Sequence, residues 1–459
     1  MAVALFAIFA AYAAVLALGA HGAESVWGAW AAGGYGAAAV LAVWSWRRHP
    51  CVPVVVAWAG AFAVPAAILP DNWGATSEER VVARAAALSL AHGTPYLAPG
   101  QLVSWRSYDP YLPGMSLFGL PHALGFPGLL GDPLTWLATA TAALLAAACR
   151  IASPGAAGRC HHRWRQALLR TLLLLSCPVF ALPMALGVTD PPVIALICLG
   201  LAWAVRRRQG HLLLSGAAIG AACALKATAW PALPVVVALV AARESRYAAA
   251  RLAGSALGSF LMIISVTAPA LLAQPRALWQ NIVAYPLGLS RRLTPAASPL
   301  PGHVLADAGS LGHLAAIVLL GGAALAIGAS LLLRPPRDVQ QASIRLAIGL
   351  TAMFLLAPDT RVGYFAYPLG VLSWLTLTAR LSWPRSQSPS LRHCASGSPA
   401  ATRMISASIW PGRTVCAQEP STRTGPGESS SPIHRSPRSS SSRWSSSRAR
   451  SRPRSCGPC

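Results

Sequence analysis

Residues 311–333 read LGHLAAIVLLGGAALAIGASLLL, a stretch that contains no aspartate, glutamate, lysine or arginine. A straight helix needs about 20 predominantly apolar residues to cross a bilayer, so this stretch predicts a membrane-spanning helix. The composition of the whole chain agrees, because 54% of its 459 residues are hydrophobic and only 11% are charged. Soluble domains typically carry about 25% charged residues. Most of this chain is therefore expected to face lipid rather than water.

Eleven further apolar runs recur along the chain and set the predicted architecture. They are residues 2–20, 27–46, 51–69, 133–149, 167–188, 191–205, 212–224, 228–242, 252–273, 344–357 and 366–380. Several are shorter than about 20 residues, which predicts tilted or broken helices inside a bundle. No basic segment precedes the first run, so we expect a first span rather than a cleaved signal peptide. The sequence predicts an all-α, polytopic transmembrane helical bundle of about twelve spans.

Arginine indicates the orientation of these spans. If twelve spans alternate, five arginine-bearing segments fall on one side: 47–48, 150–165, 206–208, 243–251 and 334–345. Cytoplasmic loops carry an excess of lysine and arginine, so this side is expected to be cytoplasmic. We therefore expect a multi-pass cell-membrane protein with a cytoplasmic N-terminus and tail and an extracytoplasmic loop at 70–131. The net charge of +24 then reflects topology and the tail, and predicts no nucleic-acid partner.

The last part of the chain has a different composition. Residues 439–455 read SSSSRWSSSRARSRPRS, and no apolar periodicity occurs from 381 to 459. Such a Ser/Arg/Pro-rich segment buries no core, so we expect a membrane domain at 1–380 and a disordered tail at 381–459. Two origins of this tail stay open: a genuine basic segment that touches anionic lipid, or a reading frame translated out of register.

Carboxylates concentrate on the expected outer side, where nine of the thirteen acidic residues of the chain fall. The loop there contains TSEERVVARAAALSLAHGTPY (76–96), which predicts an amphipathic surface helix that stops at Gly93. Glu79, Glu78 and Asp71 are the candidates for a general base at the mouth of the bundle. Glu79 also fits a helix-capping role with Thr76. The spacing leaves the choice among the three open.

Other polar residues on the same side form a candidate substrate-binding set. Lys226, the only lysine of the chain, lies in AACALKATAWPALP between two apolar half-spans, and a cation at such a depth predicts a functional site. An arginine guanidinium presents paired N–H donors to phosphate oxygens, so outer-side arginines favour a phosphate-bearing ligand. The other members of the set are Asp109, Tyr111, Asp190, Arg291, Arg292 and Arg361. Two alternatives stay open: Asp109 also fits a turn aspartate before Pro110, and Lys226 a side chain that extends to the membrane interface. The residues predict no metal site and no certain cofactor, while dependence on a divalent metal stays open.

Four motifs together resemble the multispanning glycosyltransferases of the GT-C superfamily, most closely glycosyltransferase family 87. They are SEERVVARAAALSLAHGTPY (77–96), YDPYLPGMSLFGLP (108–121), GAAIGAACALKATAWPALP (216–234) and RVGYFAYPLGVLSWL (361–375). The resemblance covers residues 50–380. Members of this family often have an aspartate followed by aromatic residues in the first large outer loop, where this chain has Glu-Glu-Arg-Val-Val.

The resemblance implies a GT-C-like bundle that transfers a mannose-like hexose or pentose from a polyprenyl-phosphate sugar. The acceptor would be a glycan or lipid of the cell envelope on the outer face, and membrane lipid would surround the protein. It also implies an acidic base in the first outer loop, at Glu79 or Glu78 with Asp71 as a further choice. The donor phosphate would lie near Lys226 and the outer arginines.

Two other functions stay open on the sequence. A transporter or flippase of a lipid-linked or small polar substrate also uses many spans and broken helices, but it favours inverted repeats and ionisable residues at the bilayer midplane. No inverted repeat is evident in the sequence. A structural or assembly protein explains the composition equally well and leaves the single lysine without a role.

Overall fold

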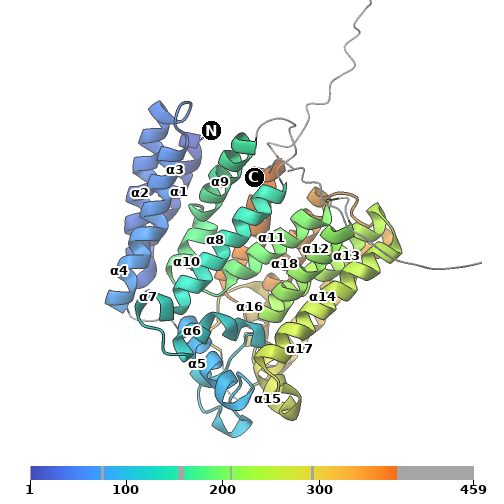
Figure 1. The fold of residues 1–459 in the computed structure, drawn as a ribbon. Coiled ribbons are helices and arrows are strands. Elements are labelled where there is room, and N and C mark those ends of the chain that lie inside the picture. The colour runs from blue at the N-terminus through green and yellow to red at the C-terminus, as the bar shows by residue number, and fades with distance from the viewer. Residues whose placement is uncertain (1, 74–76, 153–159, 207–208, 291–293, 380–459) are drawn as a thin grey trace, which may run out of the picture. The chain divides into compact units, whose positions relative to one another are not determined.

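The part of the chain that the computed structural model describes is built from helices joined by loops (Figure 1). The described residues are 2–73, 77–152, 160–206, 209–290 and 294–379. Within these ranges there is no β-strand, and an isolated parallel bridge joins Ala297 to Thr360. All of them belong to one compact unit. The all-α prediction is confirmed, while the predicted domain boundary near residue 380 and the tail lie outside the described residues.

Seven helices or helix runs of the described chain are long and apolar enough to cross a membrane. They are α1 (Ala2–Gly19), α2 (Ala23–Ser45), the run Cys51–Leu69 through α3 (Cys51–Trp58) and α4 (Val64–Trp73), α8 (Pro133–Ala152), α14 (Arg246–Thr267), α17 (Ser310–Leu333) and α18 (Val339–Leu356). An eighth span arises if α9 (Cys160–Leu175) and α10 (Pro178–Ala185), which bend by 64° at their junction, count as one. The protein is therefore embedded in the membrane, but the predicted count of about twelve spans is not confirmed.

Shorter apolar helices form the centre of the bundle. They are α11 (Asp190–Ala204), α12 (Gln209–Leu225), α13 (Ala232–Arg243) and α19 (Ala366–Ala379). Helix α11 is apolar around its whole circumference and nearly all of its side chains are buried, as expected for a helix surrounded by others. Its residues Val193, Ile194, Ile197 and Leu201 belong to the largest hydrophobic core. Both ends of α11 therefore lie among other helices.

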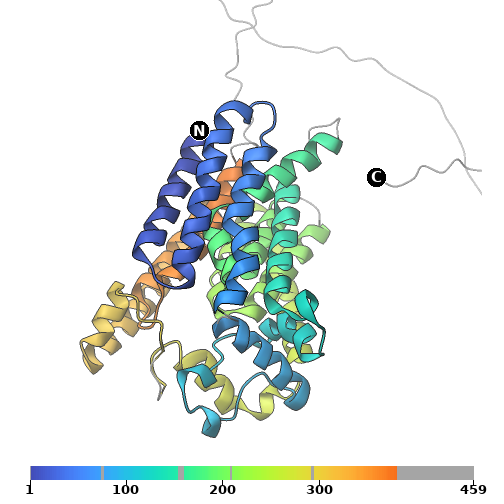
Figure 2. The same cartoon turned by 90° about the vertical axis from the view of Figure 1, so that its left-hand side faces the viewer.

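The short elements gather at one end of the bundle. Figures 1 and 2 show α5 (Ser77–His92), α6 (Leu120–Ala123), α7 (Gly128–Gly131) and α15 (Pro275–Trp279) together at this end, which we call the loop end. Helix α5 stops where the sequence predicts, because Gly93 follows it with a left-handed φ of 66° and donates its N–H to the Ser89 carbonyl at 3.0 Å. The predicted helix and its stop are thus confirmed, while its position at the membrane surface stays a prediction.

Between α5 and α6 the chain passes through a tight 3-10 helix, Pro113–Gly119. A Cβ on Gly114 would lie 2.7 Å from the Ala224 carbonyl oxygen, and one on Gly119 would lie 2.4 Å from the Val82 carbonyl oxygen. Glycine is therefore required at both positions, because the backbone of this segment touches the backbones of α12 and α5. This close approach brings Tyr111 to the end of α12.

Helices α12 and α14 also pack through backbone-to-backbone contact. Gly216 and Gly220 form a G-x-x-x-G pattern on α12, and a Cβ on Gly220 would lie 2.1 Å from the Ala256 carbonyl oxygen. Two hydroxyls of α14 bridge the same interface: Ser255 donates to the Leu213 carbonyl at 2.7 Å and Ser259 to that of Ala217 at 3.0 Å. Small residues and interhelical hydroxyl bonds are the usual means of helix association in lipid.

A Gly220→Ala substitution is expected to destabilise the fold by about 1–3 kcal/mol, because the added methyl group forces the two helices apart. The matched control is Gly258→Ala on α14, where nothing lies within 4 Å of the new Cβ. Thermal melting of both variants in the same lipid nanodiscs measures the difference. Equal melting temperatures for the two variants would contradict the close packing of α12 on α14.

Candidate active site

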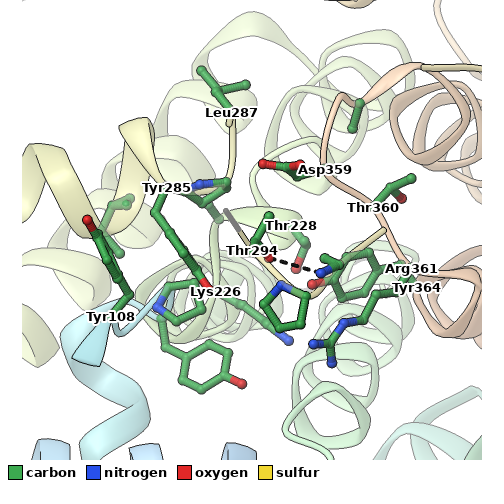
Figure 3. A pocket seen from close by; sticks show the side chains of 18 of the residues that line it. Tyr108, Lys226, Thr228, Tyr285, Leu287, Thr294, Asp359, Thr360, Arg361 and Tyr364 are labelled. Atoms are coloured by element: carbon green, nitrogen blue, oxygen red, sulfur yellow. Dashed lines mark hydrogen bonds between the residues drawn. The ribbon is translucent and has the colours of Figure 1, made fainter. Parts of the chain in front are cut away.

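A cavity of about 550 Å³ opens at the loop end of the bundle. Its walls come from α5, the break between α12 and α13, and the segments 105–111, 282–287, 294–296 and 353–364. Apolar side chains such as Leu320, Met353 and Phe354 line the part next to the spans. The ionisable residues of its lining are Glu78, Arg80, Arg84, Arg106, Lys226, Asp359 and Arg361, with several tyrosines. Figure 3 shows this cavity from close by.

Lys226 stands at the base of the cavity because α12 ends at the preceding residue and the chain becomes extended there. Only 5% of Lys226 is exposed. Its ammonium group forms an ion pair with the Asp190 carboxylate and donates to the Thr189 hydroxyl at 3.2 Å. It also lies over the rings of Tyr111 at 4.9 Å and Tyr364 at 5.7 Å. These contacts compensate the cost of burying the cation.

Asp190 lies behind Lys226 and not on the cavity surface. It occupies the first turn of α11, where the helix dipole stabilises a negative charge. The Tyr367 hydroxyl donates to its carboxylate at 2.9 Å, and Thr228 donates to the Tyr367 oxygen at 2.8 Å. The sequence places Asp190 in the substrate-binding set; its contacts are those of a residue that positions Lys226.

Glu78 reaches the same site from the first turn of α5. One of its carboxylate oxygens accepts the backbone N–H of Thr189 at 3.0 Å and the Thr189 hydroxyl at 2.8 Å. The other oxygen lies 4.0 Å from the Arg361 guanidinium. Burial acts to raise the pKa of Glu78, but the charge of Lys226 and the bonds from Thr189 hold that pKa below its ordinary value. Glu78 is therefore ionised at neutral pH.

The other two candidate bases are placed differently. Glu79 follows Glu78 on α5 and does not line the cavity. The side chain of Asp71 lies outside the described part of the chain, as do Arg291 and Arg292 of the substrate-binding set. Arg361 does line the cavity. The catalytic and binding roles assigned from the sequence thus remain predictions, and the geometry brings Glu78, Lys226 and Arg361 together.

Asp109 is buried behind the cavity wall. Its backbone N–H donates to Asn281 at 2.8 Å and its carboxylate accepts the N–H of Tyr111 at 3.0 Å. Burial raises the pKa of Asp109 to about 7. These are the contacts of an Asx turn, which fixes the backbone that presents Tyr111 to Lys226.

Several residues at the site were not predicted from the sequence. Thr189 joins Glu78 to Lys226, and its only signal was its place beside Asp190 in GVTDPP. Tyr364 and Tyr367 lie in the quoted motif RVGYFAYP, but the motif alone does not show that they surround Lys226. In the described residues, no group of three or more histidine, cysteine, aspartate or glutamate side chains is arranged to hold a metal ion.

The sequence profile of glycosyltransferase family 87 matches residues 110–358, more than half of the chain. No curated protein and no solved structure matches the chain. The matched segment begins at the turn that carries Tyr111 and includes Asp190 and Lys226, while Glu78 precedes it. A membrane-embedded helical bundle with a polar cavity at one end fits the implied activity, the transfer of a glycosyl group. The chain belongs to glycosyltransferase family 87.

Proposed function

We propose that this glycosyltransferase moves a mannose-like hexose or pentose from a polyprenyl-phosphate sugar to a glycan or lipid acceptor of the cell envelope. One observation carries the proposal: the ionised carboxylate of Glu78, the buried ammonium of Lys226 and the guanidinium of Arg361 converge on one cavity beside the membrane helices. A base and a pair of cations are the groups that glycosyl transfer from a phosphate needs.

The cavity lining supports a lipid-linked donor. Its apolar wall of Leu320, Met353 and Phe354 belongs to α17 and α18, both membrane helices. A phosphate near Lys226 and Arg361 would then lie at the end of this wall, with its hydrocarbon chain toward the bilayer. The two cations stabilise the negative charge that develops on the leaving phosphate as the bond to the sugar breaks.

Glu78 is the proposed general base. It takes the proton of the acceptor hydroxyl as the acceptor oxygen attacks C1 of the sugar and the bond from C1 to the phosphate oxygen breaks. Thr189 holds one oxygen of Glu78, which leaves the other oxygen directed toward Arg361 and the cavity. Glu79 and Asp71 are the alternatives from the sequence, and Glu79 does not line the cavity.

The proposed orientation follows from the two ends of the bundle. The connections 46–50 and 244–245, which adjoin arginines, lie at the end opposite to α5 in Figure 1. The positive-inside rule favours the cytoplasm for that end, and the cavity would then open on the extracytoplasmic side. Family membership favours this reaction over the transporter or flippase alternative.

Glu78→Gln is expected to lower the transfer rate by about 10²- to 10⁴-fold, because the amide keeps the shape of the side chain but cannot accept the proton. The measurement is transfer of labelled mannose from polyprenyl-phosphate mannose by the purified full chain in nanodiscs. Glu79→Gln is the matched control and is expected to retain activity. Full activity in Glu78→Gln, or its loss only in Glu79→Gln, would reject Glu78 as the base.

The pH dependence of the transfer rate distinguishes Glu78 from Asp109 as the general base. A base acts only when it is unprotonated, so activity is lost as the pH falls through its pKa. The pKa of Glu78 lies below its ordinary value, and kcat at saturating donor and acceptor should therefore stay nearly constant between about pH 7.5 and 6. The pKa of Asp109 is about 7. A base there would lose about tenfold in rate by pH 6, and such a loss would overturn the assignment.

A further inference from the structure

Two polar atoms of the cavity wall have no role in the site described above. Asp359 and Thr360 both line the cavity. The Oδ2 atom of Asp359 and the Oγ1 atom of Thr360 are buried and make no hydrogen bond within the described structure. Buried polar atoms are nearly always paired, so two neighbouring unpaired atoms at a cavity indicate a missing partner. A ligand with hydroxyl groups would supply it.

The backbone holds these two residues rigidly. The Thr360 N–H donates to the Ala296 carbonyl at 2.9 Å, and its carbonyl accepts the N–H of Ser298 at 3.1 Å. Gly288 has a left-handed φ of 67°, and a Cβ there would lie 2.9 Å from Asp359 Oδ2 and 2.8 Å from the His313 ring. Only glycine leaves this space beside the carboxylate. The unpaired atoms are thus kept in place by their surroundings.

An aromatic surface lies across the cavity from them. The rings of Tyr285 and Tyr108 stack with their centroids 4.3 Å apart and their planes within 10° of parallel. Both tyrosines line the cavity, and Figure 3 shows them on the side away from Thr360 and Arg361. An aromatic face packs against the C–H surface of a sugar ring, while a few polar groups of the protein fix the orientation of that ring.

We propose that Asp359 and Thr360, opposite Tyr285 and Tyr108, form the subsite that binds the hydroxyl groups of the transferred sugar and selects it. This inference rests on the proposed function and deepens it. Arg361 follows Thr360 directly and lies 4.0 Å from Glu78, so a sugar held by this subsite has its reacting carbon beside the base and the cations. Asp359 accepts two hydroxyls as a carboxylate, and Thr360 adds a neutral hydrogen bond.

Burial raises the pKa of Asp359 to about 6, against the opposing charges of His303 and His313. The carboxylate form therefore predominates at pH 7.5, the condition for the test. An ionised acceptor binds hydroxyl donors more strongly than a neutral one, so the charge of Asp359 contributes to the discrimination between sugars.

The test compares two donors, polyprenyl-phosphate mannose and polyprenyl-phosphate glucose, whose sugars differ in the orientation of one hydroxyl group. Asp359→Asn and Thr360→Val preserve side-chain volume. Each is expected to lower kcat/KM for the preferred donor about tenfold or more and to reduce the ratio between the two donors, because the wild-type site pairs its buried polar atoms with one sugar. KM for the acceptor should stay unchanged, which separates the transferred sugar from an acceptor sugar.

Asp307→Asn is the matched control. Its side chain is 70% exposed, lies 3.5 Å from His303 and does not line the cavity, so both donors should behave as with wild type. Wild-type donor ratios and KM values in both Asp359→Asn and Thr360→Val would overturn the subsite. A change confined to the KM of the acceptor would also overturn it.

A wrong donor class can be distinguished from a wrong subsite. If wild-type protein transfers from neither donor, the donor class is wrong, and binding of methyl α-mannoside and methyl α-glucoside by saturation-transfer NMR decides the subsite on its own. Saturation transfer to one glycoside in wild type and in Asp307→Asn, with loss in Asp359→Asn and Thr360→Val, supports it. Equal signals in all four proteins, or none in wild type, overturn it.

Discussion

The ion pair of Lys226 and Asp190 is the interaction on which the rest of the site depends. An unpaired cation or carboxylate at this depth is costly, so the two charges determine each other's position. The pair joins the end of α12 to the start of α11, and Tyr367 attaches α19 to the same carboxylate. Thr189 extends the network to Glu78 on α5. Four segments distant in sequence thus meet at one buried charge.

This network explains why the short helices lie at the centre of the bundle. Helix α12 ends and helix α11 begins at the ion pair, and the cavity opens beside this pair at the loop end. The 3-10 segment Pro113–Gly119 closes one side by direct backbone contact with α12. The cavity therefore combines apolar walls from membrane helices with charges fixed by buried partners. That combination suits a substrate with a hydrocarbon chain, a phosphate and a sugar.

The sequence predicted the elements better than the contacts. Long apolar runs such as 311–333 and the stop at Gly93 have local causes, and the structure confirms both. The single lysine indicated a site because its burial is costly wherever it lies. The count of about twelve spans was not confirmed, since helices of 12–17 residues inside a bundle do not show by length alone whether they cross a membrane.

The side chains of the site were harder to predict, because they depend on tertiary contacts. Glu78 and Glu79 are neighbours in sequence, but Glu78 lines the cavity and accepts hydrogen bonds from Thr189, whereas Glu79 does not line the cavity. For Asp109 the sequence left a substrate ligand and a turn aspartate open, and its hydrogen bond to the Tyr111 N–H is that of a turn. Asp359 was counted only as one acid of the outer face, although it lines the cavity.

The most direct test of this account is a double-substitution cycle on the ion pair. Lys226→Met and Asp190→Asn are each expected to destabilise the protein by about 3–5 kcal/mol, because each leaves a buried charge without its partner. The combined variant should recover much of this loss and still lack transferase activity, since the cation at the cavity is gone. Melting and transfer assays on the four proteins measure both quantities. Strictly additive destabilisation, or an active Lys226→Met protein, would contradict the central role of the pair.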